Sequence, residues 1–236
     1  MPTNVINLFC ISILLGGCAA TGQLSTNTES VDFSLDPIAF RDHGLGFLTP
    51  VSATGREADR VALALAFADA IAAEREELHV VRLAEVLSEV NRANLSLEYK
   101  KMVDDYQSTG ILEKETLRRV GEVSHVRYLG LLGLAQFTQR TNRRLSAIGL
   151  RVFDTKLASM RLSWQIWDSH TGTIAWEGSD EIDYAYDTGL EKPVNFGFVT
   201  EQAAVNLINE IPKADITLSQ VSTVVGFAGG QQLLVE

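Results

Sequence analysis

The sequence has 236 residues, 46% hydrophobic and 21% charged, which is ordinary for a globular protein with one domain. A net charge of -10 argues against nucleic acid as a partner, because an acidic domain repels a phosphate backbone. The two cysteines, Cys10 and Cys18, both lie near the N-terminus, so we expect neither a disulfide nor a thiolate metal site in the folded part.

The first segment of the chain has the pattern of an export leader. An apolar run from Val5 to Leu15 leads into Leu15-Gly16-Gly17-Cys18. The run has the length of the apolar core of a secretory leader, and small residues end it. Cleavage after Ala19 or Ala20 is one interpretation, and it would release a soluble periplasmic protein.

The four residues ending at Cys18 also resemble the bacterial lipobox, in which an aliphatic and two small residues precede an acylated cysteine. The resemblance implies that residues 1–17 are a signal peptide and that Cys18 becomes a lipidated N-terminus carrying palmitate-like chains. Several acyl chains make a stable membrane anchor. The residue after Cys18 is Ala19 and not aspartate, and in this respect the chain resembles lipoproteins that are exported to the outer membrane. We therefore expect an outer-membrane anchor with the domain facing the periplasm.

Residues 18–38 contain many Ser, Thr and Asn side chains and few apolar ones. Such a composition buries too little surface to fold, so we predict a flexible tether that spans about 20 Å.

Alternating strand and helix patterns predict one α/β (α+β) domain over residues 39–212. We expect a short strand at 45–48, and then a capping box, Thr54 to Glu57, that opens a helix reaching Glu76. The inward face of this helix is predicted to hold Val61, Ala64, Leu65, Ala68, Ile71 and Ala72, and Leu63, Ala66 and Phe67 widen the apolar stripe, so we expect cover on more than one side. A strand at 78–81, helices at 83–94, 96–108 and 113–125, strands at 128–137, 157–168 and 173–186, and a helix from Thr200 to Pro212 follow. The fold class is therefore a mixed sheet of about five strands flanked by helices, and residues 213–236 form a tail without assignment.

Two segments within this domain carry a family resemblance. One runs from Leu117-Arg118-Arg119 through His125 into an apolar strand, and the other is Trp167-Asp168-Ser169-His170-Thr171-Gly172 followed by Trp176-Glu177. Together with the Ala-rich last helix, they resemble bacterial cell-envelope lipoproteins over residues 45–212. These include the curli secretion-channel lipoproteins and the activators of penicillin-binding proteins, and their domain is similar to the N-terminal domain of the Tol propeller protein. The resemblance implies non-enzymatic binding without naming the partner.

No pattern of catalytic residues emerges from the sequence. The four histidines lack metal-ligand spacing, and there is no nucleophile elbow and no phosphate-binding glycine loop. The acidic run Asp180, Glu181, Asp183 and Asp187 could bind calcium, but strand alternation places Glu181, Asp183 and Asp187 on one solvated face instead. We therefore predict no catalytic residue, no metal site and no cofactor.

Two groups of residues are candidates for contact with a partner. Trp164 shares an apolar face with Leu162 and Ile166, whereas Trp167 faces the other way and could form a contact surface with Trp176, although packing in the core is the alternative. The second group is a set of basic residues in the predicted connection between two strands, namely Arg140, Arg143, Arg144 and Arg151, with Lys156 beside them. They form either a solvated loop or a contact with anionic lipid, glycan or an acidic partner.

These features favour an outer-membrane lipoprotein that acts as an accessory or regulatory binding module for an envelope protein or cell-wall component. The alternative is a subunit of a homo-oligomeric secretion or export channel, and the oligomeric state stays open at this point.

Overall fold

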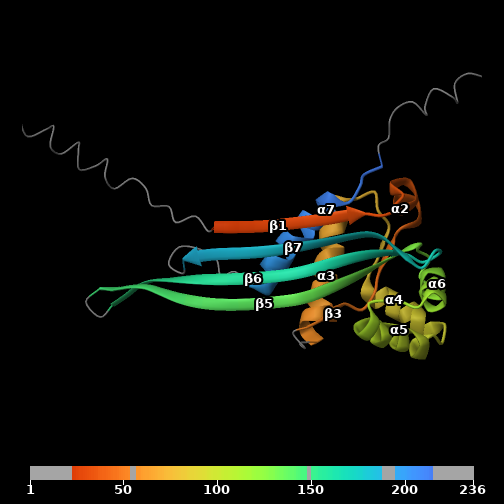
Figure 1. The fold of residues 1–236 in the computed structure, drawn as a ribbon, viewed down its shortest axis with the longest axis horizontal. Helices are drawn as coiled ribbons and strands as arrows, with labels where there is room; N and C mark the ends of the chain where they lie inside the picture. Colours follow the sequence, from red (N-terminus) through yellow and green to blue (C-terminus); the bar gives the residue numbers. More distant parts are fainter. Residues whose placement is uncertain (1–22, 54–56, 148–149, 188–194, 215–236) are drawn as a thin grey trace, which may run out of the picture.

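The computed structural model describes residues 23–53, 57–147, 150–187 and 195–214. They form one mixed sheet with helices packed on both faces, which confirms the predicted α/β class (Figure 1). The strand order is β1-β7-β6-β5-β2-β4, and β3 pairs with β5 further along that strand. No described helix is both long enough and apolar enough to cross a bilayer. The elements, in chain order, are β1 (Gln23–Asp32), α2 (Pro37–His43), β2 (Leu45–Phe47), β3 (Val51–Ser52), α3 (Glu57–Glu74), β4 (Val80–Val81), α4 (Leu83–Arg92), α5 (Ser96–Thr109), α6 (Lys114–Val123), β5 (Tyr128–Ala147), β6 (Leu150–Asp168), β7 (Thr173–Asp187) and α7 (Phe196–Glu210).

Each face of the sheet has its own hydrophobic core. Under α3 and α7, the indole of Trp164 stacks on Phe47 with centroids 6.2 Å apart and meets Trp176 edge-on at 5.6 Å. The core under α4, α5 and α6 contains Trp167. Glycine is required beside both indoles of the first core. A Cβ at Gly130 would lie 2.8 Å from Trp164 Nε1, and one at Gly178 would lie 2.4 Å from the Trp176 ring.

Strand β1 contradicts the predicted tether. Its ten residues pair antiparallel with β7, from Gln23 opposite Ala185 to Asp32 opposite Trp176. The prediction failed because it weighed only apolar content. An edge strand needs backbone hydrogen bonds and one partly covered face, and it can be polar elsewhere. The described domain therefore begins at Gln23 rather than at residue 39.

The inward face of α3 differs in part from the prediction. Ala64, Ala68 and Ile71 are buried as predicted. Val61 and Leu65 are exposed instead, and the covered face includes Leu63 and Phe67, which widen the predicted stripe. The helix is rich in alanine all around, so its sequence defines no single apolar stripe. The aromatic surface of Phe47 and Trp164 selects the face that carries Phe67, whose ring lies 5.4 Å from Trp164. The predicted cap at Thr54 lies outside the described residues.

Strands β5 and β6 are much longer than predicted, and this difference matters most for function. They continue through the segment that we expected to be a connecting loop and pair from Tyr128 opposite Asp168 to Ala147 opposite Leu150. Twenty residues of strand span about 65 Å. Helices cover only part of that length, and the end of the β5–β6 hairpin projects beyond them (Figure 1).

Candidate functional site

Strands β1, β7, β6 and β5 form an antiparallel sheet, called the arm below, whose two faces differ in character. One face packs against α7 and α3 through Met160, Leu162 and Ile182. The register places polar residues together on the other face, which we call the bare face. Its members are Gln136 and Thr138 on β5, Ser159, Arg161 and Ser163 on β6, Ser179, Glu181 and Asp183 on β7, and Ser25, Asn27 and Glu29 on β1. The predicted alternation along β6 is thus confirmed.

Charged and hydroxyl groups on the bare face pair across strands. Arg161 Nη2 lies 2.7 Å from Glu181 Oε1, and both side chains are about half exposed. The Ser159 hydroxyl donates to the Asp183 carboxylate. Exposed pairs of this kind contribute at most about 1 kcal/mol each to stability. They leave paired donors and acceptors facing solvent on this side of the sheet.

Asp180 departs from the rest of the acidic run because it lies on the covered face. It is 1% exposed and accepts hydrogen bonds from Thr28 Oγ1 at 2.7 Å and from Asn206 Nδ2 at 3.1 Å. Burial raises the pKa of its carboxyl, and the two hydrogen bonds oppose that rise. The side chain thereby connects β1 and α7 to β7. Glu181 and Asp183 lie on the solvated face as predicted, and no cluster of three metal ligands occurs among the described residues.

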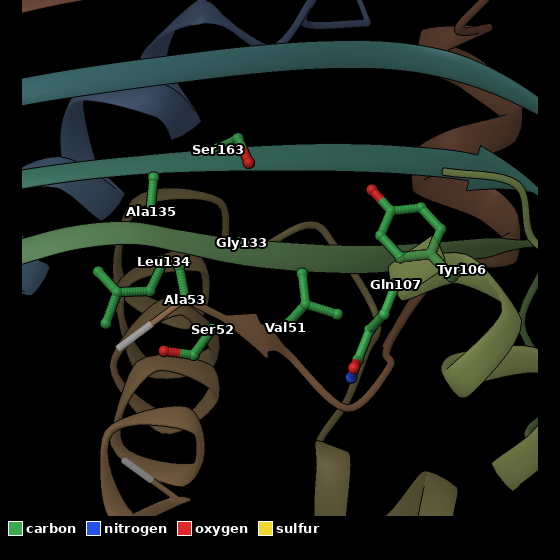
Figure 2. A pocket seen from close by; sticks show the side chains of 9 residues that line it. All are labelled: Val51, Ser52, Ala53, Tyr106, Gln107, Gly133, Leu134, Ala135 and Ser163. Atoms are coloured by element: carbon green, nitrogen blue, oxygen red, sulfur yellow. The ribbon is translucent and has the colours of Figure 1, made fainter. Parts of the chain in front are cut away.

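A hollow of about 410 Å³ lies at the helical end of the bare face, between α5 and β3 (Figure 2). Tyr106 and Gln107 border it on one side, and Ser52 and Ala53 border it on the other (Figure 2). The hollow reaches the sheet at Gly133, where a Cβ would lie 2.6 Å from Ser163 Oγ.

A short hydrogen-bond network fixes the side chains next to this hollow. Gln165 Oε1 accepts from Tyr106 OH at 2.9 Å and from Trp167 Nε1 at 3.1 Å, and Gln165 Nε2 donates to Glu177 Oε1 at 3.2 Å. Burial, with a smaller contribution from Glu177, raises the pKa of Tyr106, so its hydroxyl stays protonated at neutral pH. The nine lining residues offer hydroxyl and amide groups rather than a general base. This arrangement suits hydrogen bonding to a peptide or glycan better than proton transfer.

Both edges of the arm are open in the described part of the chain. β1 is the last strand of the sheet, and the pairing of β3 with β5 ends at Ser52 opposite Leu134. Beyond Leu134 a bulge shifts the register, and the outer edge of β5 has no described partner strand. Open edges present unpaired N–H and C=O groups to any strand that can approach them.

The structure separates the residues predicted to contact a partner. Trp167 and Trp176 are 4% and 1% exposed and lie in different cores. Packing in the core, the alternative given above, is therefore confirmed for both, and they form no contact surface. The alternation of β6 sends Trp164 and Trp167 to opposite faces, and the turn at 169–172 returns Trp176 to the face of Trp164. Arg140 is exposed on β5. Arg143 and Arg144 lie further along β5 and Arg151 lies on β6, so these residues form strands rather than the loop that we predicted. Cys18 lies outside the described residues.

Sequence reasoning missed the hollow and the contribution of β1. Thr28 and Asn206 carry no local signal of their pairing with Asp180, because they lie 152 and 26 residues from it. The length of β5 had one local signal, because Gln136, Thr138 and Arg140 stand at every second position with Phe137 between the first two, a spacing typical of a strand.

Comparison with known proteins gives weak structural similarities only. No known family matches the sequence, and neither does any curated protein. A PelC dodecamer from Paraburkholderia phytofirmans is similar at a TM-score of 0.43 and 8% identity, over 80% of this chain and 95% of that one. The lipoprotein GNA1162 from Neisseria meningitidis is similar at a TM-score of 0.38 and 9% identity, over 71% and 99% of the two chains. Similarities of this strength do not assign a function.

Proposed function

We propose that the chain is a lipoprotein, anchored at Cys18 in the outer membrane, whose domain binds another component of the cell envelope as a non-enzymatic accessory or regulator. The observation that supports it is the arm, in which four strands expose a polar face and, within the described residues, leave two edges without a partner strand. A sheet surface of this kind can bind an extended partner through backbone pairing and side-chain hydrogen bonds.

The sequence supports the anchor. The lipobox resemblance places the acylated residue at Cys18, and the described sheet begins only five residues later, at Gln23. A domain attached so closely to a membrane remains near that surface, where its partners would also be found.

The anchor can be tested by labelling cells with a clickable palmitate analogue. The chain should incorporate the label, Cys18→Ala should not, and the labelled protein should sediment with outer-membrane fractions. Equal labelling of the wild type and the variant would contradict this part of the proposal. Ser12→Ala, a substitution inside the leader, serves as a matched control that should leave labelling intact.

The two open edges favour a second candidate, a homo-oligomeric secretion or export assembly. Because each strand of the arm is antiparallel to its neighbour, β1 runs antiparallel to β5 of the same chain. A second copy could therefore place its β5 beside β1 and continue the same antiparallel pattern, and such head-to-tail contacts generate rings or filaments. Light scattering of the detergent-solubilised protein separates the candidates. A monomer at micromolar concentration supports the accessory role, and a defined higher oligomer supports the assembly.

A further inference from the structure

The end of the β5–β6 hairpin is basic in a chain that is otherwise acidic. Residues 140–156 contain five basic side chains and one acidic one, Asp154, which gives this segment a net charge of +4 in a chain of net charge -10. The basic residues are Arg140, Arg143, Arg144, Arg151 and Lys156. A local excess of this size attracts anionic surfaces, and screening confines the attraction to about 10 Å.

The register places this basic segment at the far end of the arm. In the backbone register Arg143 lies opposite Asp154 and Ser146 opposite Arg151, close to the last described pair of the hairpin, Ala147 opposite Leu150. The described pairing of β6 with β7 begins only at Thr155 opposite Asp187. Beyond that point the described hairpin is a two-stranded ribbon that projects away from the helices (Figure 1).

The N-terminal end of β1 lies on the same side of the molecule. Gln23 on β1, Ala185 on β7, Leu157 on β6 and Arg140 on β5 lie opposite one another and form one row across the four strands. From this row, the hairpin continues seven residues to Ala147, about 23 Å. The five residues from Cys18 to Gln23 can span at most about 18 Å. A lipid on Cys18 and the basic hairpin end can therefore reach the same membrane surface.

We propose that the hairpin end binds the headgroups of anionic phospholipids and acts as a second membrane contact beside the lipid anchor. This inference rests on the proposed lipidation of Cys18. A lipid surface fits better than an acidic protein or a glycan because the anchor would bring the hairpin to a membrane in any case. The composition also fits, since the segment combines arginines with the apolar residues Leu145, Leu150 and Phe153, and sequences that combine the two bind anionic membrane surfaces. Two contacts would fix the orientation of the arm and direct the helical end away from the membrane.

A fluorophore on a single introduced thiol tests the orientation in the lipidated protein. Removal of the leader takes Cys10 away and acylation blocks Cys18, so Ser146→Cys would carry the only free thiol. In vesicles of phosphatidylcholine with phosphatidylglycerol, a quencher attached to lipid should quench the label at position 146. The same quencher should have far less effect on a label at Leu97→Cys, because Leu97 is an exposed position on α5, at the helical end of the molecule. Equal quenching at both positions would overturn the proposal.

The second measurement is independent of the anchor. The full chain with Cys18→Ser is bound to vesicles of phosphatidylcholine alone or with phosphatidylglycerol. We expect binding to the anionic vesicles only, weakened by salt, and reduced at least about 25-fold by the pair Arg143→Glu and Arg144→Glu, from about 5-fold per basic residue. The matched control, Lys100→Glu with Lys101→Glu on α5, reverses the same charge on an exposed helix.

An equal loss in both variants, or no preference for anionic vesicles, would refute headgroup binding by the hairpin. Selective loss in the arginine variant, together with no palmitate label on the wild-type chain in cells, would support the hairpin contact and contradict the anchor. Failure of this inference and failure of the proposed function therefore give different results.

Discussion

The attachment of β1 to the sheet can be tested by replacing Thr28 with valine, which has nearly the same shape and lacks the hydroxyl. Thr28 Oγ1 donates a 2.7 Å hydrogen bond to the buried carboxylate of Asp180, which has one other side-chain donor, Asn206. A hydrogen bond to a charged group contributes about 1.5–3 kcal/mol, so Thr28→Val should lower the free energy of unfolding by about 2 kcal/mol at neutral pH.

The pH dependence of this loss gives the prediction a second check. Burial raises the pKa of the Asp180 carboxyl above 3.8, the ordinary value for aspartate. Ionising this carboxyl is therefore harder in the folded chain than in the unfolded one, and the free energy of unfolding falls as pH rises through the interval from 3.8 to the raised pKa. Removing a donor to the charged form raises the pKa further. The cost of Thr28→Val should therefore be largest above that interval and should shrink in acid, where the carboxyl is protonated.

Urea unfolding followed by fluorescence of the buried tryptophans measures both effects. Asp180→Asn provides the matched background, because its neutral amide cannot titrate. There Thr28→Val should cost about 1 kcal/mol and show no dependence on pH over this range. A cost below about 0.5 kcal/mol in both backgrounds would refute the contact and the attachment of β1 that depends on it.

Three further predictions concern the core and one ion pair. Arg127→Gln removes the 2.7 Å partner of Asp168 and should cost about 1–3 kcal/mol at neutral pH. Burial raises the pKa of Asp168, but the hydrogen bonds from Arg127 and His170 hold it below 3.8, so the contribution of the pair is lost as pH falls through that lowered value. Thermal melts over a series of pH values from about 7 downward should show the cost of the substitution shrinking in acid. Leu63→Ala should cost about 2–5 kcal/mol and Leu65→Ala under about 1 kcal/mol in chemical denaturation, and equal costs would contradict the observed face of α3. Gly178→Ala should cost about 1–3 kcal/mol through overpacking against an indole, and an unchanged melting temperature would contradict the close packing there.

The fold class could be predicted because most elements have local signals. The helix patterns around Leu117 and Leu207 and the alternation of Met160, Leu162, Trp164 and Ile166 identify helices and a strand, and the structure confirms each of them. The features of the arm could not be predicted in the same way. β1 is held by pairing with a strand about 150 residues away, so no window of sequence contains both members of the interaction.

The inward face of α3 and the burial of Trp167 show a second limit. The alanine-rich helix presents apolar surface on every side, and only the position of Phe47 and Trp164 determines which side is covered. Alternation correctly placed Trp167 opposite Trp164. It could not reveal that helices cover both faces at that end of the sheet, so that both indoles are buried.

The central claim, that the arm of a membrane-anchored chain is its binding surface, is tested most directly by site-specific photocrosslinking in intact cells. A photoreactive residue at position 161, on the bare face, should give a discrete crosslinked product, and one at position 100, on the exposed side of α5, should not. Mass spectrometry of the product would distinguish a second copy of the chain from a different envelope protein. No product from position 161, or the same products from both positions, would contradict the claim.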